Sequence, residues 1–414
     1  MSTTPREPDP TTHGTAGVVD TLRSPGFAAL WSSNLIHSSA WFAQLLVLQW
    51  LVTSLTDSRT LLGVVGFAQG AAMFLVAPAA GVVADRWPGR ELLIVTRLLL
   101  AAAVGVIAWL LRADLIEVWH LIIGAAVFGV LASLMQPASQ TLVFDIVPRA
   151  LSERAISLNA AVSGVAQTAG PLVAGALLAR HGFLGSEIRI AAALAVGVTV
   201  LFAIPRPSAR TERAPSHWLD DLREGLRFAV AHPPVRWVLL ACSMSFFNGG
   251  ISAMRPIFAR HVLEVGADGY GMLAAAAGAG GIGTAIVLAL RRPLRHPGLW
   301  IVGTMWAFAT IVGLYAFAFS FSYLLVLELA SGIVGQLWMV STFTGIQMGV
   351  PEHMRGRIMS LVFMLVMASP VGNLAVGALA DLIGDQRAMG VFGAVPFVVL
   401  GTLWALKRED LRRL

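Results

Sequence analysis

Residues 81–93 read GVVADRWPGRELL, and this polar turn joins two long apolar runs, Leu61–Ala84 and Leu92–Leu111. An apolar run of about 20 residues is long enough to cross the hydrocarbon core of a bilayer. The two runs therefore predict a pair of membrane-spanning helices. The turn between them is too short to form a domain of its own.

The pattern of an apolar run followed by a short polar turn extends along most of the chain. Hydrophobic residues make up 57% of the 414 positions and charged residues 13%, whereas a soluble domain carries about 25% charged residues. We therefore expect lipid to be the main solvent. The twelve predicted spans are Phe27–Val52, Leu61–Ala84, Leu92–Leu111, Trp119–Phe144, Ala155–Ala179, Ile190–Ile204, Val235–Phe258, Tyr270–Leu290, Leu299–Phe319, Tyr323–Gln347, Ile358–Ala380 and Met389–Leu406.

The distribution of basic residues predicts the orientation of these spans. Short cytoplasmic loops collect Arg and Lys, and most of the 29 in this chain fall on the side of the N-terminus. We therefore expect both termini in the cytoplasm. Residues 1–26 contain no apolar signal segment, so the first span is expected to direct insertion. The net charge of +6 lies at the ends of spans, and no nucleic-acid partner is expected.

One long polar segment, from Pro205 to Pro234, divides the chain into halves. Within it, apolar residues from Trp218 to Ala229 form one stripe, which predicts an amphipathic helix on the membrane surface or an exposed linker helix. The expected units are a cytoplasmic tail (1–26), a six-helix bundle (27–205), a cytoplasmic linker with the amphipathic helix (206–234), a second six-helix bundle (235–406) and a second tail (407–414).

An internal repeat supports the division into halves. Four residues recur 203 positions later: Pro148, Arg154, Ser157 and Leu158 as Pro351, Arg357, Ser360 and Leu361. A second block recurs 202 positions later: Gly175, Ala176, Leu177 and Gly182 as Gly377, Ala378, Leu379 and Gly384. A duplicated six-helix unit in parallel orientation is typical of transporters whose substrate site lies between the halves.

The turn at Gly81 also carries a family resemblance. Its G-x-x-x-D-R followed by G-R resembles the cytoplasmic gate motif of the major facilitator superfamily, although Gly89 and Arg90 lie one residue later than usual. Residues 27–52, 147–182 and 350–384 are similar to the branch of that superfamily that includes the enterobactin exporter. The resemblance implies an all-α integral membrane fold of twelve helices in two pseudo-symmetric bundles, and export by alternating access.

The gate motif predicts a set of gating residues on the cytoplasmic side. Asp85 ends its span where it could face the positive N-terminus of another helix, a contact worth about 0.3–1 kcal/mol. The alternative is an ordinary turn with solvated ion pairs worth about 0–1 kcal/mol. The predicted gating residues are Gly81, Asp85, Arg86, Arg90, Asp145, Arg154, Arg355 and Arg357.

Polar side chains within the spans are the candidates for substrate and proton binding, because in lipid they face the bundle interior or a water-filled cavity. The predicted cavity residues are Ser33, His37, Trp41, Gln44, Gln136, Gln140, Asn248, Gln336 and Asn373. For the amides, hydrogen bonding between helices is the alternative. Glu328, Arg255 and His37 are the candidates for proton coupling; Glu328 could instead form a structural pair with Arg255 or lie at the outer mouth, and His37 could be a hydrogen-bonded core residue.

Several classes of function are not supported by the sequence. It contains no Gly-x-x-x-x-Gly-Lys phosphate loop, no clustered metal ligands and no converging catalytic groups, so we expect no cofactor, no metal and no enzyme activity. Cys242 is the single cysteine, which excludes a disulfide within the chain.

We expect a monomer in a bacterial inner membrane that exports a small molecule, such as a siderophore, a drug or another secondary metabolite, in exchange for protons. Proton-coupled uptake of a metabolite and a non-transporting membrane sensor are the alternatives.

Overall fold

The computed structural model describes Thr21, Ser24 and residues 26–148, 151–205, 218–290 and 297–411. These residues form helices joined by short turns, with no strand among them. Within the described chain, nine helical ranges are long and apolar enough to cross a membrane. One of the nine, Arg154–Leu201, contains two crossings. Two further crossings are made by the broken helix over residues 233–257 and by the helix Asp385–Leu411. The all-α arrangement of twelve spans is therefore confirmed.

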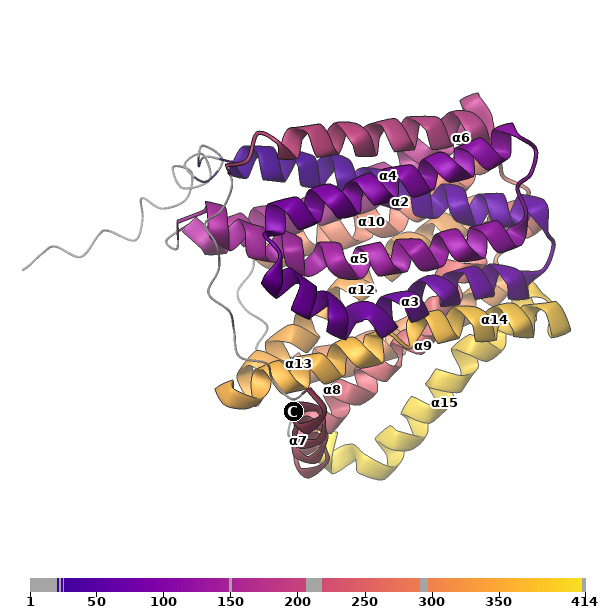
Figure 1. The fold of residues 1–414 in the computed structure, drawn as a ribbon. Helices are drawn as coiled ribbons and strands as arrows, with labels where there is room; N and C mark the ends of the chain where they lie inside the picture. Colours follow the sequence, from indigo (N-terminus) through magenta and orange to yellow (C-terminus); the bar gives the residue numbers. More distant parts are fainter. Residues whose placement is uncertain are drawn as a thin grey trace, which may run out of the picture.

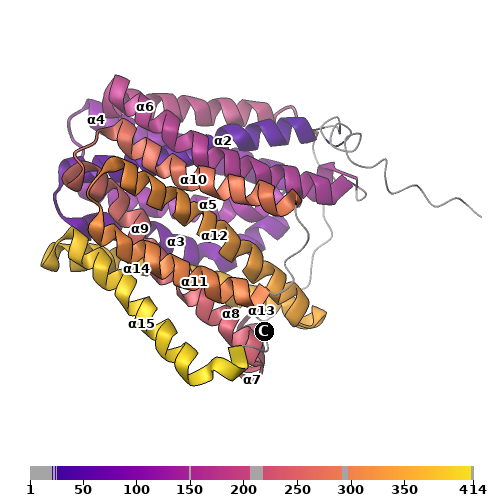
Figure 2. The same cartoon turned by 180° about the vertical axis from the view of Figure 1, so that it is seen from behind.

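The N-terminal half, coloured indigo to magenta in Figures 1 and 2, is built from five helical elements. They are α2 (Phe27–Leu55), α3 (Arg59–Arg86), α4 (Gly89–Arg112), α5 (Val118–Ile146) and α6 (Ser152–Leu201). Short turns connect them, so consecutive helices run antiparallel. The predicted N-terminal tail lies almost wholly outside the described residues.

The element α6 contains two antiparallel arms. Gly182, at φ 64° and ψ −171°, has a backbone conformation that few residues other than glycine adopt, and the chain reverses there. Asn34 of α2 bonds to Asn159 of the first arm at 2.7 Å, and its neighbour Ser33 bonds to Gly197 of the second arm at 2.5 Å. The predicted spans leave residues 180–189 between them, whereas in the structure both arms remain helical up to the turn at Gly182.

The C-terminal half, coloured salmon to yellow, lies alongside the first (Figures 1 and 2), with α10 against α6 and α14 against α3. Its elements are α8 (Pro233–Ser243), α9 (Ser245–Ile257), the π-helix η3 (Phe258–Val262), α10 (Ala267–Leu290), α11 (Pro297–Leu314), the 3₁₀-helix η4 (Tyr315–Phe317), α12 (Phe321–Gly349), α13 (Glu352–Val366), α14 (Ser369–Ile383) and α15 (Asp385–Leu411).

The helix that connects the halves in sequence, α7 (Trp218–Ala231), packs on α13 and α8 of the C-terminal half (Figure 1). Gly225 packs against Arg357 and Leu361 of α13, while Leu226 and Val230 on the other face are 54% and 62% exposed. This is the segment predicted as an amphipathic helix: Phe228 and Ala229 pack against the protein, whereas Leu226 and Val230 face away from it. Residues 206–217 of the predicted linker lie outside the described residues.

Two crossings of the C-terminal half are broken in the middle. The first changes from α8 to α9 at Met244, and the second changes from α13 to α14 near Met367. The hydroxyl of Ser245 donates to the carbonyl oxygens of Leu365 and Val366, at 2.9 and 3.2 Å. A break inside lipid leaves backbone groups unpaired unless a neighbour bonds to them. Ser245 supplies that bond, so each break lies beside the other.

Glycines allow the same close approaches in both halves. Gly129 of α5 faces the carbonyl oxygen of Gln69 in α3, and Gly332 of α12, 203 positions later, faces that of Ala277 in α10. A Cβ at either glycine would overlap with the opposing carbonyl oxygen. Small residues that let backbones approach are the usual basis of helix packing in lipid. The sequence repeat therefore corresponds to a repeated packing contact.

Replacing Gly129 by alanine is expected to lower the free energy of unfolding by about 1–3 kcal/mol, because α3 and α5 must move apart to admit the methyl group. Thermal unfolding of the purified protein in detergent measures the effect. Gly105→Ala in α4 is the control, since no atom lies within 4 Å of the added Cβ. Equal unfolding temperatures for the two variants would show that this contact is not tight.

Candidate functional site

The two halves meet at one end of the bundle and separate at the other. We call the end where α2 begins and α15 ends the terminus side, and the opposite end the far side. On the far side, Gly377 abuts the backbone of Arg59, and Gly271 abuts that of Gly175. On the terminus side, no atom lies within 4 Å of a Cβ built on Gly81. Figure 1 shows the same difference, with α3 and α14 side by side toward the far side and α5 and α13 apart at the terminus side, so the described structure is closed on the far side and open on the terminus side.

The far side is held by an acid that caps a helix of the other half. The carboxylate of Asp381, near the end of α14, accepts hydrogen bonds from the backbone N–H groups of Arg59 and Thr60, both at 2.9 Å. It also accepts from the hydroxyls of Ser58 and Thr60, at 3.1 and 2.6 Å. Arg59 in turn forms a bidentate pair with Asp385, at 2.9 and 3.0 Å. A carboxylate at the positive N-terminus of α3 stabilises this closure.

An aromatic contact closes the far side nearer to the membrane interior. Tyr270 of α10 is almost fully buried and donates its hydroxyl hydrogen to Gln49 of α2, at 2.6 Å. Its ring stacks on Trp50, with ring centroids 5.4 Å apart. The guanidinium of Arg260 lies over the same indole, 5.7 Å from its centroid. These contacts join elements of both halves.

A buried ion pair lies within the C-terminal half. Arg255 of α9 donates its Nε and Nη2 hydrogens to the two carboxylate oxygens of Glu328 in α12, at 2.5 and 2.8 Å. Tyr315 donates its hydroxyl hydrogen to the same carboxylate at 2.6 Å. Glu328 is fully buried, which excludes exposure at an outer mouth. The predicted pairing with Arg255 is present.

The face of α2 that was predicted to line a substrate cavity is buried against α6 instead. Ser33 donates to the carbonyl oxygen of Gly197 at 2.5 Å, and Gln44 donates to Glu187 at 3.1 Å. His37 between them is only 9% exposed. The prediction that Ser33, His37 and Gln44 line the cavity is wrong, because the second arm of α6 covers this face.

The remaining predicted cavity residues fall into two groups. Gln136, Gln140 and Asn248 are exposed, and Gln336 is half-buried. Trp41 packs edge-on against Phe128 of α5, with ring centroids 6.3 Å apart. The first four remain available to a ligand, whereas Trp41 contacts its own half.

Asn373 lies where three helices meet. Its side-chain oxygen accepts a hydrogen bond from Ser252 of α9 at 3.2 Å, and its backbone and amide pack closely against Gly63 and Gly66 of α3. These contacts match the alternative given for the amides, which is hydrogen bonding between helices.

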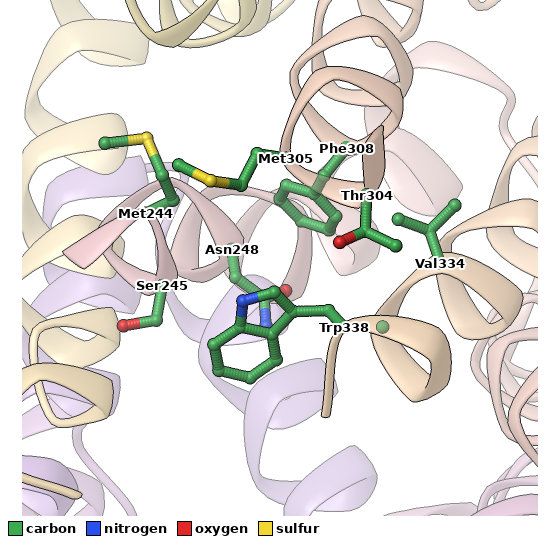
Figure 3. A pocket seen from close by; sticks show the side chains of 9 residues that line it. Met244, Ser245, Asn248, Thr304, Met305, Phe308, Val334 and Trp338 are labelled. Carbon is green, nitrogen blue, oxygen red and sulfur yellow. The ribbon is translucent and has the colours of Figure 1, made fainter. Parts of the chain in front are cut away.

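One small pocket, of about 50 Å³, lies in the C-terminal half among α9, α11 and α12. Figure 3 shows Asn248 and Trp338 among its lining side chains, with Phe308 and Thr304 on α11. Such a mixture of aromatic and thioether groups with a few polar atoms is typical of small-molecule sites. The lining residues are Met244, Ser245, Asn248, Thr304, Met305, Phe308, Val334, Gly335 and Trp338.

Arg90, one of the predicted gating residues, bonds to the end of α6. Arg90 donates to the carbonyl oxygens of Leu201 and Phe202, at 3.2 and 3.3 Å. The predicted grouping of Arg90 with Asp145 and Arg154 stays a prediction. The last carbonyls of α6 lack helical partners and attract the guanidinium.

Across the opening, the basic residues of α13 have local partners. Arg357 pairs with Glu224 of α7 at 2.6 Å, and Arg355 donates to a backbone carbonyl five residues earlier at 3.1 Å. Arg86 at the end of α3 is exposed. The side chain of Asp85 lies outside the described residues.

Sequence reasoning missed two buried ionisable residues in the N-terminal half. Arg97 of α4 is 2% exposed and donates to Ser33 and Asn34, at 2.6 and 2.5 Å. Glu187 in the second arm of α6 is fully buried. In the sequence, Arg97 counts among the basic residues of the cytoplasmic side, and Glu187 falls between two predicted spans. For Asp381, a signal was present, since Gly377-x-x-x-Asp381 repeats the spacing of Gly81-x-x-x-Asp85.

Two related six-helix bundles that close one end of a polar interior define a transporter of the major facilitator type. The chain belongs to the family described as transmembrane secretion effector, whose model matches residues 16–408. It is therefore a multi-pass membrane transporter and not an enzyme.

Its relatives include transporters of siderophores. The Staphyloferrin A transporter of Staphylococcus aureus (strain NCTC 8325 / PS 47) is 21% identical over 91% of this chain and 95% of its own length. The Enterobactin exporter EntS of Shigella boydii serotype 4 (strain Sb227) is 25% identical over 87% and 86%.

The fold resembles that of a bacterial homolog of the human lysosomal transporter Spinster in an inward-facing, unoccupied conformation. The TM-score is 0.74 at 12% identity, over 97% of this chain and 98% of that one.

Asp381→Ala is expected to shift the protein toward a far-side-open conformation, because α3 loses the acid that caps its N-terminus. A loss of about 1–2 kcal/mol corresponds to a population change of about five- to thirty-fold. Spin-label distances between Leu55 in α2 and Leu382 in α14, both exposed, report the opening after Cys242 is replaced by serine. Asp57→Ala is the control, since no hydrogen bond is seen to its carboxylate. Unchanged distances in Asp381→Ala would show that the cap formed by Asp381 does not hold the far side closed.

Glu328→Gln is expected to lower the free energy of unfolding by about 3–5 kcal/mol, because Arg255 is left buried without a counter-charge. The double variant Arg255→Met, Glu328→Gln should recover more than half of that loss, while Tyr315 keeps an acceptor. Thermal unfolding in detergent measures both variants, with Glu264→Gln as an exposed control. Additive losses in the double variant would mean that the pair is not coupled.

Proposed function

We propose that this protein is a secondary active exporter that carries a small molecule out of the cytoplasm by alternating access, in exchange for protons. The observation that carries the proposal is the closure of the far side by contacts between the halves while the terminus side is open. This is the arrangement that a transporter needs to load a substrate from one side only. With the positive side inside, the terminus side is the cytoplasmic side.

Two helices provide the switch between conformations. The antiparallel α3 and α14 each carry a G-x-x-x-D sequence near the C-terminal end, Gly81 to Asp85 and Gly377 to Asp381. In this conformation Asp381 caps the N-terminus of α3. In the opposite conformation, Asp85 takes the corresponding place at the N-terminus of α13, beside Arg355. Each acid then stabilises one end of the cycle, by an energy sufficient to bias two states separated by a few kcal/mol.

Charged residues around Asp85 complete the cytoplasmic gate. Closing the terminus side brings α3 toward α13 and releases Arg357 from Glu224 of α7, its partner in the open conformation. The residues that we assign to this gate are Gly81, Asp85, Arg86, Arg90, Asp145, Arg154, Arg355 and Arg357. The two six-helix bundles, residues 27–205 and 235–406, move as units on either side of the linker.

The substrate is a bulky, weakly charged compound, and a siderophore fits best. The pocket in the C-terminal half offers the rings of Phe308 and Trp338 with the amide of Asn248. Two relatives are transporters of siderophores by name, and one of these is an exporter. Exposed Gln136 and Gln140 of α5 supply hydrogen bonds from the other half.

Uptake of a metabolite by proton symport is the second candidate, since the same fold can run in either direction. The name of the Staphyloferrin A transporter does not state a direction of transport, so it is compatible with uptake as well as export. Both readings use a single copy of the chain in a bacterial inner membrane, with both termini in the cytoplasm.

Flux measurements test the proposal. Inside-out vesicles with an acidic interior should release protons when a siderophore, antibiotic or dye that is a substrate is added, because export moves the compound inward and protons outward. Glu328→Gln should reduce this response if its ion pair takes part in coupling, whereas Glu264→Gln should leave it unchanged.

Flux in the opposite direction, with protons and compound moving together, would establish uptake instead. Binding of a compound without flux in either direction would contradict transport and favour a sensor.

A further inference from the structure

A buried carboxyl group in the N-terminal half lacks the partner that a charge requires. Glu187 is fully buried in the second arm of α6, and its Oε1 accepts a hydrogen bond from Nε2 of Gln44 at 3.1 Å. Its other oxygen, Oε2, has no hydrogen-bond partner, and neither has Oε1 of Gln44. Two buried acceptors thus lie on paired side chains with no donor between them.

A single proton on Oε2 of Glu187 would give both unpaired oxygen atoms a hydrogen-bond partner. An unpaired buried acceptor costs about 1–3 kcal/mol, and an isolated buried carboxylate costs far more. A neutral carboxylic acid presents one acceptor and one donor, and a primary amide presents the same pair in reverse. With its proton on Oε2, Glu187 accepts from Nε2 of Gln44 and donates to Oε1 of Gln44.

We propose that Glu187 is a proton-binding site of the N-terminal half, occupied in this terminus-open conformation and paired there with Gln44. The inference rests on the proposed proton-coupled transport, for which it names the residue that carries the proton in this half. The transported proton would be held as a carboxylic acid and released as H⁺ when the carboxylate becomes hydrated.

No charged group in the described structure competes with this assignment. Glu187 forms no ion pair with any described Arg, Lys or His. Besides exposed Asp114 and Arg180, six ionisable residues lie at this end of the helices around it, all of them exposed except half-buried His120. They are Arg112 of α4, Glu117 and His120 at the start of α5, His181 and Arg189 of α6, and Asp268 of α10.

A metal ion does not fit the site. Two oxygen atoms are too few for the hard cations, which take six or more oxygen ligands. Within the described residues, no group of three or more His, Cys, Asp or Glu side chains is positioned to hold a metal.

Further unpaired polar atoms continue from Glu187 toward the terminus side. His37 lies seven residues before Gln44 on α2, about 10 Å along the helix, and its Nδ1 has no partner. Arg97 follows beside Ser33 and Asn34, with its Nε unpaired. Steps of this length need bridging water, and each unpaired atom offers water a hydrogen bond. These unpaired atoms lie between Glu187 and the terminus side.

Infrared spectroscopy of the purified protein in lipid, without substrate, tests the proton site directly. A protonated carboxylic acid has its own C=O stretching band, separate from that of a carboxylate. At neutral pH this band should be present in the unaltered protein and lost in Glu187→Gln, whose amide can still pair with Gln44. Gln44→Leu should shift the band to higher frequency, since its hydrogen bond is removed. Glu328→Gln should leave it in place.

Persistence of the band in Glu187→Gln, or its absence from the unaltered protein, would overturn the proposal. Because no substrate is present, these outcomes do not depend on whether the protein exports anything. A separate measurement addresses coupling: Glu187→Gln should lose the proton release that a substrate triggers while keeping exchange of labelled for unlabelled substrate. Proton release equal to that of the unaltered protein would contradict a coupling role for Glu187.

Discussion

Close approach of helix backbones at glycine is the constraint on which the rest of this structure depends. Helices in lipid gain no hydrophobic free energy by associating, so packing and hydrogen bonds hold them together. Gly129 and Gly332 admit a neighbouring carbonyl oxygen within each half, and Gly175 and Gly377 do so between the halves. The duplicated unit therefore carries two kinds of contact. One is internal to a half, and the other exists only while the far side is closed.

The spans could be predicted because lipid leaves the backbone few choices: an apolar run of sufficient length must be helical. The elements that pack against each face of a span could not be predicted from the sequence. Spacing shows that Ser33 and Gln44 share one side of α2, but only the packing of α6 decides whether that side meets water or protein. Glu187 escaped notice for a related reason, because the polar stretch around Gly182 has the composition of a loop while its backbone stays helical on both sides.

The two halves treat buried charge differently despite their common plan. In the C-terminal half, Arg255 and Glu328 neutralise each other in a bidentate pair with Tyr315 attached. In the N-terminal half, Arg97 and Glu187 lie near opposite ends of the buried face of α2, too far apart to pair. Buried ionisable residues without a counter-charge are costly and persist where function requires them. The symmetry of the fold thus extends to helices and glycines but not to its ionisable groups.

The hydrogen bonds of Ser245 have a mechanical consequence. Its hydroxyl bonds to the carbonyl oxygens of Leu365 and Val366 at the end of α13, and that of Leu365 also accepts a turn hydrogen bond from the N–H of Ala368 at 2.9 Å. Straightening that crossing would return the carbonyls to helical partners and leave the hydroxyl with none. Bending of one broken crossing is therefore coupled to bending of the other. The C-terminal half can change curvature as a unit, while the N-terminal half, whose α2 is continuous, serves as the stiff frame against which it bends.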